Sequence, residues 1–195
     1  MDKHKMNETD KILNLSNPST IAVVLMDLQP RLLQAIPGGD QLISANSILL
    51  QSAKLLKLPV LVTEQVPEKL GATDSSLREK MDPSFVFAKN SFSAFGCSPF
   101  TDQISHLGID HLILAGIELP ICIYLTAFDA LRRNLQVTIL SDCVSCRRPQ
   151  DGEVALGELS RLGATVIALE TFLYQSLESS EHTSFRMISE MIRGR

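Results

Sequence analysis

The chain has 195 residues, of which 45% are hydrophobic and 21% charged, and its formal net charge is −4. This length suits one domain with a sizeable core, and the negative charge without a basic stripe argues against nucleic acid as a partner. No apolar run approaches the ~20 residues needed to cross a bilayer, and the first ten residues lack the apolar core of a secretory signal. We therefore expect a cytoplasmic protein that makes no contact with a membrane.

Residues 1–18 are predicted to form an N-terminal arm and residues 19–195 a single domain. The arm ends in the turn cluster Asn17-Pro18-Ser19-Thr20. Six short apolar runs follow that do not alternate with polar residues, which is typical of strands buried on both faces. These runs are residues 21–26, 59–62, 85–88, 112–115, 137–140 and 165–169.

Helical patterns separate these runs. They cover residues 41–56, 74–81, 100–107, 121–133 and 151–162, with one or two more helices within 171–193. In the helix at 151–162, Asp151 is the expected N-cap and Gly163 follows the last turn. Because strands followed by helices imply right-handed crossovers, we predict an α/β fold with a parallel sheet and helices on both faces.

Ligands of an open parallel sheet bind beyond the carboxyl ends of the strands. Few reactive side chains are expected at that edge, namely Asp27, Glu64, Lys89, Glu118, Cys122, Asp142, Cys143 and Glu170. Cys122 is the candidate nucleophile, because it lies where the chain leaves the fourth strand and begins a helix after Pro120. A helix N-terminus favours thiolate over thiol and can stabilise an oxyanion. The alternative is a small buried apolar residue, as most free cysteines are, and location alone leaves both open.

A cysteine nucleophile needs a base. His106 and His111 are expected at the amino-terminal edge of the sheet, and the other two histidines fall in terminal segments. This placement disfavours a Cys-His pair and leaves Asp27 and Lys89 as the candidates for proton transfer. Asp27 ends an apolar strand, where burial would raise its pKa toward that of a base. Taken singly, Asp27 can also be a turn residue and Lys89 a solvated charge.

Three segments of the chain match one family in the family's own order. They are Val24-Leu25-Met26-Asp27-Leu28-Gln29, Lys89-Asn90-Ser91-Phe92-Ser93-Ala94-Phe95 and Gly116-Ile117-Glu118-Leu119-Pro120-Ile121-Cys122-Ile123. Together they resemble the motifs of the isochorismatase-like cysteine hydrolases. Two further segments, Thr63-Glu64-Gln65-Val66-Pro67 and Glu170-Thr171-Phe172-Leu173-Tyr174-Gln175, look most like the group called isochorismatase domain-containing proteins.

The resemblance implies a three-layer, Rossmann-like fold whose six-stranded parallel sheet has the order 3-2-1-4-5-6. It also implies a catalytic triad in which Asp27 takes the thiol proton, Cys122 attacks a carbonyl carbon and Lys89 supports the charges. Water would then hydrolyse the thioester intermediate. A cis peptide between Ile117 and Glu118 is implied as well, which would aim the Glu118 N–H, with that of Cys122, into an oxyanion hole.

Two departures from relatives within the superfamily narrow the expected reaction. Nicotinamidases bind a metal through an Asp-x-His motif after the second strand, where this chain has Thr63-Glu64-Gln65. We therefore predict neither a metal nor a cofactor. True isochorismatases need no cysteine nucleophile, so Cys122 favours hydrolysis of a C–N or ester bond. The predicted substrate is a small amide or imide.

The predicted substrate pocket is mostly apolar. Its wall is expected from loop positions to include Gln29, Gln65, Phe92, Phe95, Leu119 and Ile123. For each of the two phenylalanines, ordinary packing is the alternative. The resemblance also implies a homo-oligomer, a dimer or larger, with Leu173 and Leu177 as candidates for its interface.

Two other functions stay open. The first is a binding or scaffold module that keeps the triad but has a closed pocket. The second is a redox protein that uses Cys143 and Cys146, which have Cys-x-x-Cys spacing. Four cysteines are too few for a disulfide framework in this chain, so we expect reduced thiols. A structural role is favoured for this pair, because small residues fill the same positions in the resembling family.

Overall fold

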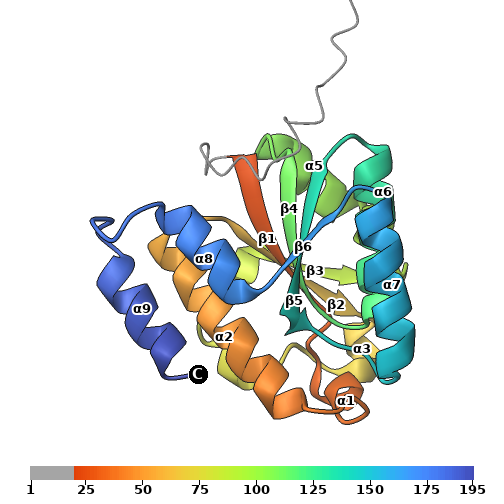
Figure 1. Cartoon of the computed structure of the whole chain (residues 1–195). Coiled ribbons are helices and arrows are strands. Elements are labelled where there is room, and N and C mark those ends of the chain that lie inside the picture. The colour runs from red at the N-terminus through yellow and green to blue at the C-terminus, as the bar shows by residue number, and fades with distance from the viewer. Residues whose placement is uncertain (1–19) are drawn as a thin grey trace, which may run out of the picture.

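Six parallel strands form the centre of the molecule, in the order β3-β2-β1-β4-β5-β6 (Figure 1). The computed structural model describes residues 20–195, so the predicted arm at residues 1–18 lies outside the described residues. The strands are β1 (Ile21–Met26), β2 (Val60–Gln65), β3 (Val86–Lys89), β4 (His111–Gly116), β5 (Gln136–Val144) and β6 (Thr165–Ile167). The predicted parallel sheet and its strand order are confirmed.

Helices cover both faces of this sheet (Figure 1). The α-helices are α1 (Pro30–Leu33), α2 (Gly39–Leu55), α3 (Pro67–Leu70), α4 (Ser75–Arg78), α5 (Ser98–His106), α6 (Tyr124–Arg132), α7 (Pro149–Arg161), α8 (Leu169–Leu177) and α9 (Phe185–Arg193). Short 3-10 turns lie at Pro83–Phe85 and Ala94–Gly96, and a π-helical turn, η5, lies at Leu119–Ile123. No helix within residues 20–195 is both long and apolar enough to cross a membrane.

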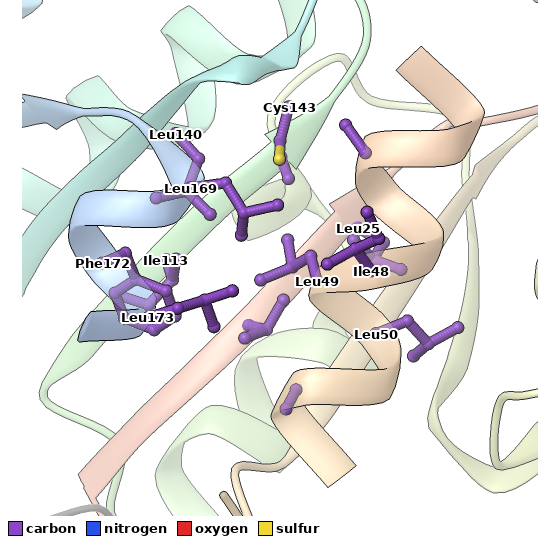
Figure 2. Close-up of a cluster of buried hydrophobic side chains, with 14 of the residues drawn as sticks. Leu25, Ile48, Leu49, Leu50, Ile113, Leu140, Cys143, Leu169, Phe172 and Leu173 are labelled. Atoms are coloured by element: carbon purple, nitrogen blue, oxygen red, sulfur yellow. The ribbon is translucent and has the colours of Figure 1, made fainter. Parts of the chain in front are cut away.

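The core has two parts, one on each face of the sheet. On the first face, side chains of α2 and α8 pack against alternate residues of the central strands, as Figure 2 shows for Leu25, Leu49, Ile113 and Phe172. On the second face, α5, α6 and α7 pack against the residues that alternate with these. All six residues of β1 and of β4 are buried, which explains why both strands read as continuous apolar runs.

Leu173 and Leu177, predicted to help bury an interface between subunits, lie in the first of these cores. Their side chains are 0% and 2% exposed in the single chain. The prediction is wrong for these two residues, because the amphipathic helix α8 turns them toward the sheet rather than toward solvent.

Several element boundaries differ from their predictions. Helix α7 begins at Pro149 with Arg148 as its N-cap, so the expected N-cap at Asp151 is wrong. Proline is favoured in a first helical turn and starts the helix earlier. The four-residue helices α1 and α3 were not predicted; each begins at a proline, and neither is long enough to show a helical period.

Gly116 brings the end of β4 against the end of β1. Its φ is +112°, and a Cβ atom added there would lie 2.1 Å from the Met26 carbonyl oxygen. The next residue, Ile117, donates its N–H to the same oxygen at 2.9 Å. This close approach, which requires glycine, places the turn after β4 beside Asp27.

Candidate active site

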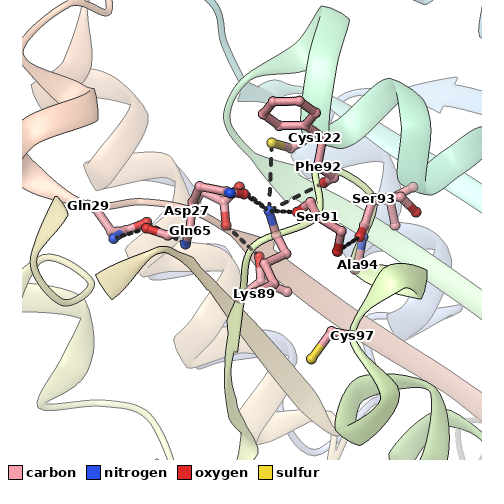
Figure 3. Close-up of polar contacts among 12 residues, drawn as sticks. Asp27, Gln29, Gln65, Lys89, Ser91, Phe92, Ser93, Ala94, Cys97 and Cys122 are labelled. Carbon is pink, nitrogen blue, oxygen red and sulfur yellow. Dashed lines mark hydrogen bonds and ion pairs between the residues drawn. The ribbon is translucent and has the colours of Figure 1, made fainter. Parts of the chain in front are cut away.

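The three residues of the predicted triad meet at the carboxyl edge of the sheet (Figure 3). Asp27 follows β1, Lys89 ends β3, and Cys122 lies in the π-helical turn after β4. The Lys89 Nζ atom is 2.8 Å from Asp27 Oδ2 and 3.7 Å from Cys122 Sγ. All three residues are buried, being 1%, 3% and 7% exposed. The fold thus brings a carboxylate, an ammonium group and a thiol into one contact.

Asp27 is held by its neighbour on β2. Its φ is +55°, in the left-handed region, and its N–H donates to the Thr63 carbonyl at 3.0 Å. The Thr63 hydroxyl donates to Asp27 Oδ1 at 2.7 Å. Burial raises the pKa of Asp27, while the charge of Lys89 and hydrogen bonds from Lys89, Thr63 and Cys122 oppose that rise.

The Lys89 ammonium group has acceptors on several sides. Besides Asp27 and Cys122, Nζ lies 2.5 Å from Gln65 Oε1 and 3.3 Å from each of the carbonyls of Ser91 and Phe92. The side chains of the Lys89–Asp27 pair are 0% and 1% exposed. A buried charge is tolerated when it is paired and hydrogen-bonded, and this one is both.

Cys122 is a thiol at neutral pH. Burial and the negative charge of Asp27 raise its pKa to about 12, and the charge of Lys89 and a hydrogen bond from the Glu118 backbone lower it by less. Burial and the neighbouring carboxylate thus oppose the effect expected of the helix start, which favours a thiolate. An attacking sulfur at this position needs a base that takes its proton.

The turn that carries Cys122 has the local geometry implied by the resemblance. The Ile117–Glu118 peptide is cis, as predicted. Glu118 precedes the π-helical turn, and its carbonyl accepts the N–H groups of Ile121 and Ile123 at 3.0 and 3.2 Å. Its carboxylate forms an ion pair with Arg147. A hydrogen bond from the Glu118 backbone to Cys122 is one of the contacts that lower the pKa of the thiol.

Gln29 and Gln65, two of the predicted pocket residues, form a structural pair. The Gln29 amide donates to the Gln65 carbonyl at 3.0 Å and to the Gly71 carbonyl at 2.5 Å, and accepts the Gln65 N–H at 2.8 Å. Gln29 is 0% exposed, so it lies behind the site rather than on its surface. Gln65 reaches Lys89, as described above, and also donates to the Asn90 carbonyl at 3.0 Å.

The four apolar pocket residues differ in exposure. Phe92 is 58% exposed, and its backbone carbonyl accepts a hydrogen bond from Lys89 Nζ (Figure 3). Phe95 is partly buried, with the Arg133 guanidinium 4.6 Å from its ring centroid. Leu119 and Ile123 are 4% and 0% exposed and belong to the second core. Of these four side chains, Phe92 is the most exposed to solvent, and the pocket as a whole stays a prediction.

Thr63 is the functional candidate that sequence reasoning missed. Residues i and i+2 of a strand face the same way, so Thr63 and Gln65 both point toward the triad. Glu64 points to the other face, where it accepts the N–H and hydroxyl of Thr73 at 2.7 and 2.8 Å. The signal was the polar ending of an otherwise apolar strand, Val60-Leu61-Val62-Thr63-Glu64-Gln65.

The remaining reactive side chains lie elsewhere. His111 begins β4 at the amino-terminal edge, as expected, and its Nε2 is 2.9 Å from the Thr138 hydroxyl. Cys143 packs into the first core and Cys146 into the second, on opposite faces of the sheet, which disfavours a redox pair. Within residues 20–195, no three side chains of His, Cys, Asp or Glu come together in a group that could hold a metal ion.

Comparisons with known protein sequences point to one family. The family model described as Isochorismatase domain matches residues 21–171. Isochorismatase domain-containing protein 2A from Mus musculus is 33% identical over 90% of this chain and 84% of its own length. Isochorismatase domain-containing protein 1 from Salmo salar is 33% identical over 95% of this chain and 66% of its own length. The protein of the same name from Danio rerio is matched over 63% of its length. The chain therefore spans slightly less than two thirds of these two relatives.

Solved structures share the fold. The MAR1 ribonuclease from Caenorhabditis elegans superposes with a TM-score of 0.85 at 30% identity, over 91% of each chain. The YcaC gene product from Escherichia coli, described as an octameric hydrolase of unknown specificity, has a TM-score of 0.81 over 91% of this chain and 96% of its own. At 18% identity, that second likeness concerns the fold alone.

Proposed function

Because the chain belongs to the isochorismatase family, we propose that it is a metal-independent cysteine hydrolase that cleaves a C–N bond in a small amide or imide. The observation that carries this proposal is the buried Lys89 ammonium group, which contacts Asp27 and Cys122 at once. A carboxylate, an ammonium group and a thiol in one buried contact are the parts that nucleophilic catalysis requires.

The proposed first step is attack by the sulfur. Asp27 takes the thiol proton of Cys122, and the sulfur bonds to the carbonyl carbon. The backbone N–H groups of Glu118 and Cys122 are proposed to stabilise the resulting oxyanion. The C–N bond then breaks, Asp27 passes its proton to the leaving nitrogen, and a thioester remains on Cys122.

The proposed second step returns the enzyme to its starting state. Asp27 takes a proton from water, and the oxygen of that water attacks the thioester carbon. The C–S bond breaks, the carboxylic acid leaves, and Asp27 returns the proton to the sulfur. Throughout, the positive charge of Lys89 lies 2.8 Å from Asp27 and offsets the negative charge that moves between oxygen and sulfur.

The substrate is proposed to be small and weakly polar. The charged groups around Cys122 are already paired, Lys89 with Asp27 and Glu118 with Arg147. Phe92, whose carbonyl contacts Lys89, adds an exposed aromatic ring. An uncharged substrate with an apolar group suits this setting better than an anion does.

The test is turnover of a panel of amides and imides by the wild type and by Cys122→Ala. We expect turnover that Cys122→Ala abolishes, together with an acyl adduct on the Cys122 peptide by mass spectrometry. The matched control is Cys97→Ala, which removes another buried thiol, one that lies against the Ala88 carbonyl. Turnover that survives Cys122→Ala, or an adduct at Cys97, would contradict the proposal. An inactive wild type favours the binding or scaffold module.

RNA belongs in the same assay because one structural relative is described as a ribonuclease. We propose no RNA substrate, since the net charge of −4 gives no electrostatic attraction to a phosphate backbone. RNA cleavage that Cys122→Ala abolishes would overturn the small-molecule proposal. A homo-oligomer and a cytoplasmic location also stay proposals.

A further inference from the structure

The end of β2 carries three polar side chains in succession, and the mechanism above uses none of them. Glu64 is bonded to Thr73 on the far face of the strand, and Gln65 bonds Lys89. Thr63 is 0% exposed. Its strand, β2, lies between β1, which Asp27 follows, and β3, which Lys89 ends. Its position in the sheet is fixed by pairing with Met26, the residue before Asp27.

Thr63 makes two separate contacts with Asp27. Its carbonyl accepts the Asp27 N–H at 3.0 Å, and its hydroxyl donates to Asp27 Oδ1 at 2.7 Å. The first contact belongs to the backbone and survives any substitution of the side chain. The second fixes the rotation of the carboxylate, because it holds Oδ1 while Lys89 holds Oδ2. Substitution can therefore remove the second contact alone.

We propose that Thr63 is a positioning residue for the proton acceptor of this site, through the hydrogen bond from its hydroxyl to Asp27. The inference rests on the proposed role of Asp27 as the base. The hydroxyl keeps the carboxylate turned toward Cys122 and stabilises its ionised form, which is the form that can accept the thiol proton. Threonine suits this task because its β-branched side chain has few rotamers and holds the hydroxyl in place.

Loss of the hydroxyl leaves Oδ1 buried without that donor. A buried hydrogen bond to a charged group contributes about 1.5–3 kcal/mol, which corresponds to at least a tenfold change in an equilibrium constant. The pKa of Asp27, already raised by burial, rises further when the hydrogen bond from Thr63 is removed. A protonated Asp27 cannot accept the proton of Cys122, so the sulfur becomes less reactive at neutral pH.

Alkylation of Cys122 by iodoacetamide tests the positioning role of Thr63 without knowledge of the substrate. The sulfur displaces iodide, a thioether forms, and the thiol proton leaves through Asp27 to water. We expect Thr63→Val, which keeps the shape of the side chain, to lower the alkylation rate at pH 7 about tenfold. We also expect the acidic inflection of the pH–rate profile to move to higher pH, and Thr63→Ser to restore most of the rate.

The matched control is Thr138→Val. Thr138 is another fully buried threonine of the sheet, and its hydroxyl contacts His111 at the opposite edge. We expect the control to keep the wild-type profile for Cys122. A Thr63→Val profile equal to that of the wild type would overturn the proposal. A Thr63→Ser variant that reacts as slowly as Thr63→Val would overturn it too. The serine variant also keeps the test valid if the valine variant fails to fold.

A fourth variant separates this inference from the proposed function. If Asp27→Asn alkylates at Cys122 as fast as the wild type or faster, the role of Asp27 as base fails, and the proposal for Thr63 fails with it. If Asp27→Asn is slow while Thr63→Val is normal, the base role stands and only the positioning role is overturned.

Discussion

The Lys89–Asp27 ion pair is the most consequential contact in the molecule at the scale of single residues. Both side chains are almost completely removed from water. Desolvation of two charges costs several kcal/mol per ion, which their attraction and further hydrogen bonds must offset. Here Gln65 and two carbonyls supply further acceptors for Lys89, and Thr63 supplies a donor for Asp27. Such a pair is a costly way to stabilise a fold, and it fits a chemical role better.

We predict that Lys89→Met lowers the free energy of unfolding by about 3–5 kcal/mol, because it leaves Asp27 buried without its counter-charge. The double variant Asp27→Asn with Lys89→Met should be more stable than Lys89→Met alone. Urea denaturation at pH 7 measures both. Lys54→Met, at an exposed position of α2, is the control and should change little. A cost of less than 1 kcal/mol for Lys89→Met would count against the buried pair.

The sequence was most informative about which residues meet. Asp27, Lys89 and Cys122 each follow or end a strand, so the resemblance and the strand order were enough to bring them together. The protonation state of Cys122 was not predictable, because it depends on burial and on the distance to Asp27. The contact from Thr63 was missed because it depends on the register between β1 and β2, which periodicity does not reveal.

At the scale of elements, the junction of β4 and β1 decides whether the site forms. Gly116 has a backbone conformation that side chains rarely adopt, and the Met26 backbone occupies the space of a side chain there. The turn with Cys122 begins three residues later. Any displacement at Gly116 therefore moves Cys122 relative to Asp27.

Gly116→Ala is expected to lower the free energy of unfolding by about 2–5 kcal/mol, since it combines backbone strain with a steric clash. Gly157→Ala is the control. Gly157 lies within helix α7 with open space around it, so alanine there should stabilise the protein by up to about 1 kcal/mol. Thermal or urea denaturation compares the two. Equal effects of the two substitutions would contradict the role given to Gly116.

The elements themselves were predictable where they are long or wholly apolar. All six strands were anticipated, but β2 and β5 continue beyond their predicted ends through Thr63-Glu64-Gln65 and Ser141-Asp142-Cys143-Val144. These endings contain polar residues that the sheet satisfies with specific partners. Asp142, for example, accepts the N–H of Leu169 at 2.7 Å. A pattern of apolar residues cannot show such partners.

The sheet carries buried polar contacts at both of its ends. The candidate site lies at the carboxyl edge, and a different kind of contact lies at the amino-terminal edge. At the opposite edge, His111 is 2% exposed. Burial lowers the pKa of His111 to about 4, and the nearby charge of Asp110 opposes this only in part. The folded protein therefore holds His111 as the neutral imidazole at neutral pH.

This burial predicts a loss of stability in acid. The unfolded chain binds a proton at His111 near pH 6.5, whereas the folded protein resists it until about pH 4. The contribution of the neutral His111 to the free energy of unfolding is thus fully present above pH 6.5. It is lost as the pH falls toward 4, and the loss amounts to about 3 kcal/mol. Urea denaturation across this range should show a shallower decline for His111→Gln than for the wild type. The exposed His106→Gln should decline like the wild type, and the same slope in all three proteins would refute the prediction.

The place of β1 in the sheet has a consequence for synthesis of the chain. β1 is made first, yet it lies between β2 and β4, and its pairing with β4 runs from Ile21 with His111 to Met26 with Gly116. Until residue 116 has been made, one edge of this wholly apolar strand has no partner. An open apolar edge is a template for pairing with other chains. Growing chains that end before residue 116 are therefore expected to aggregate more readily than chains that include β4.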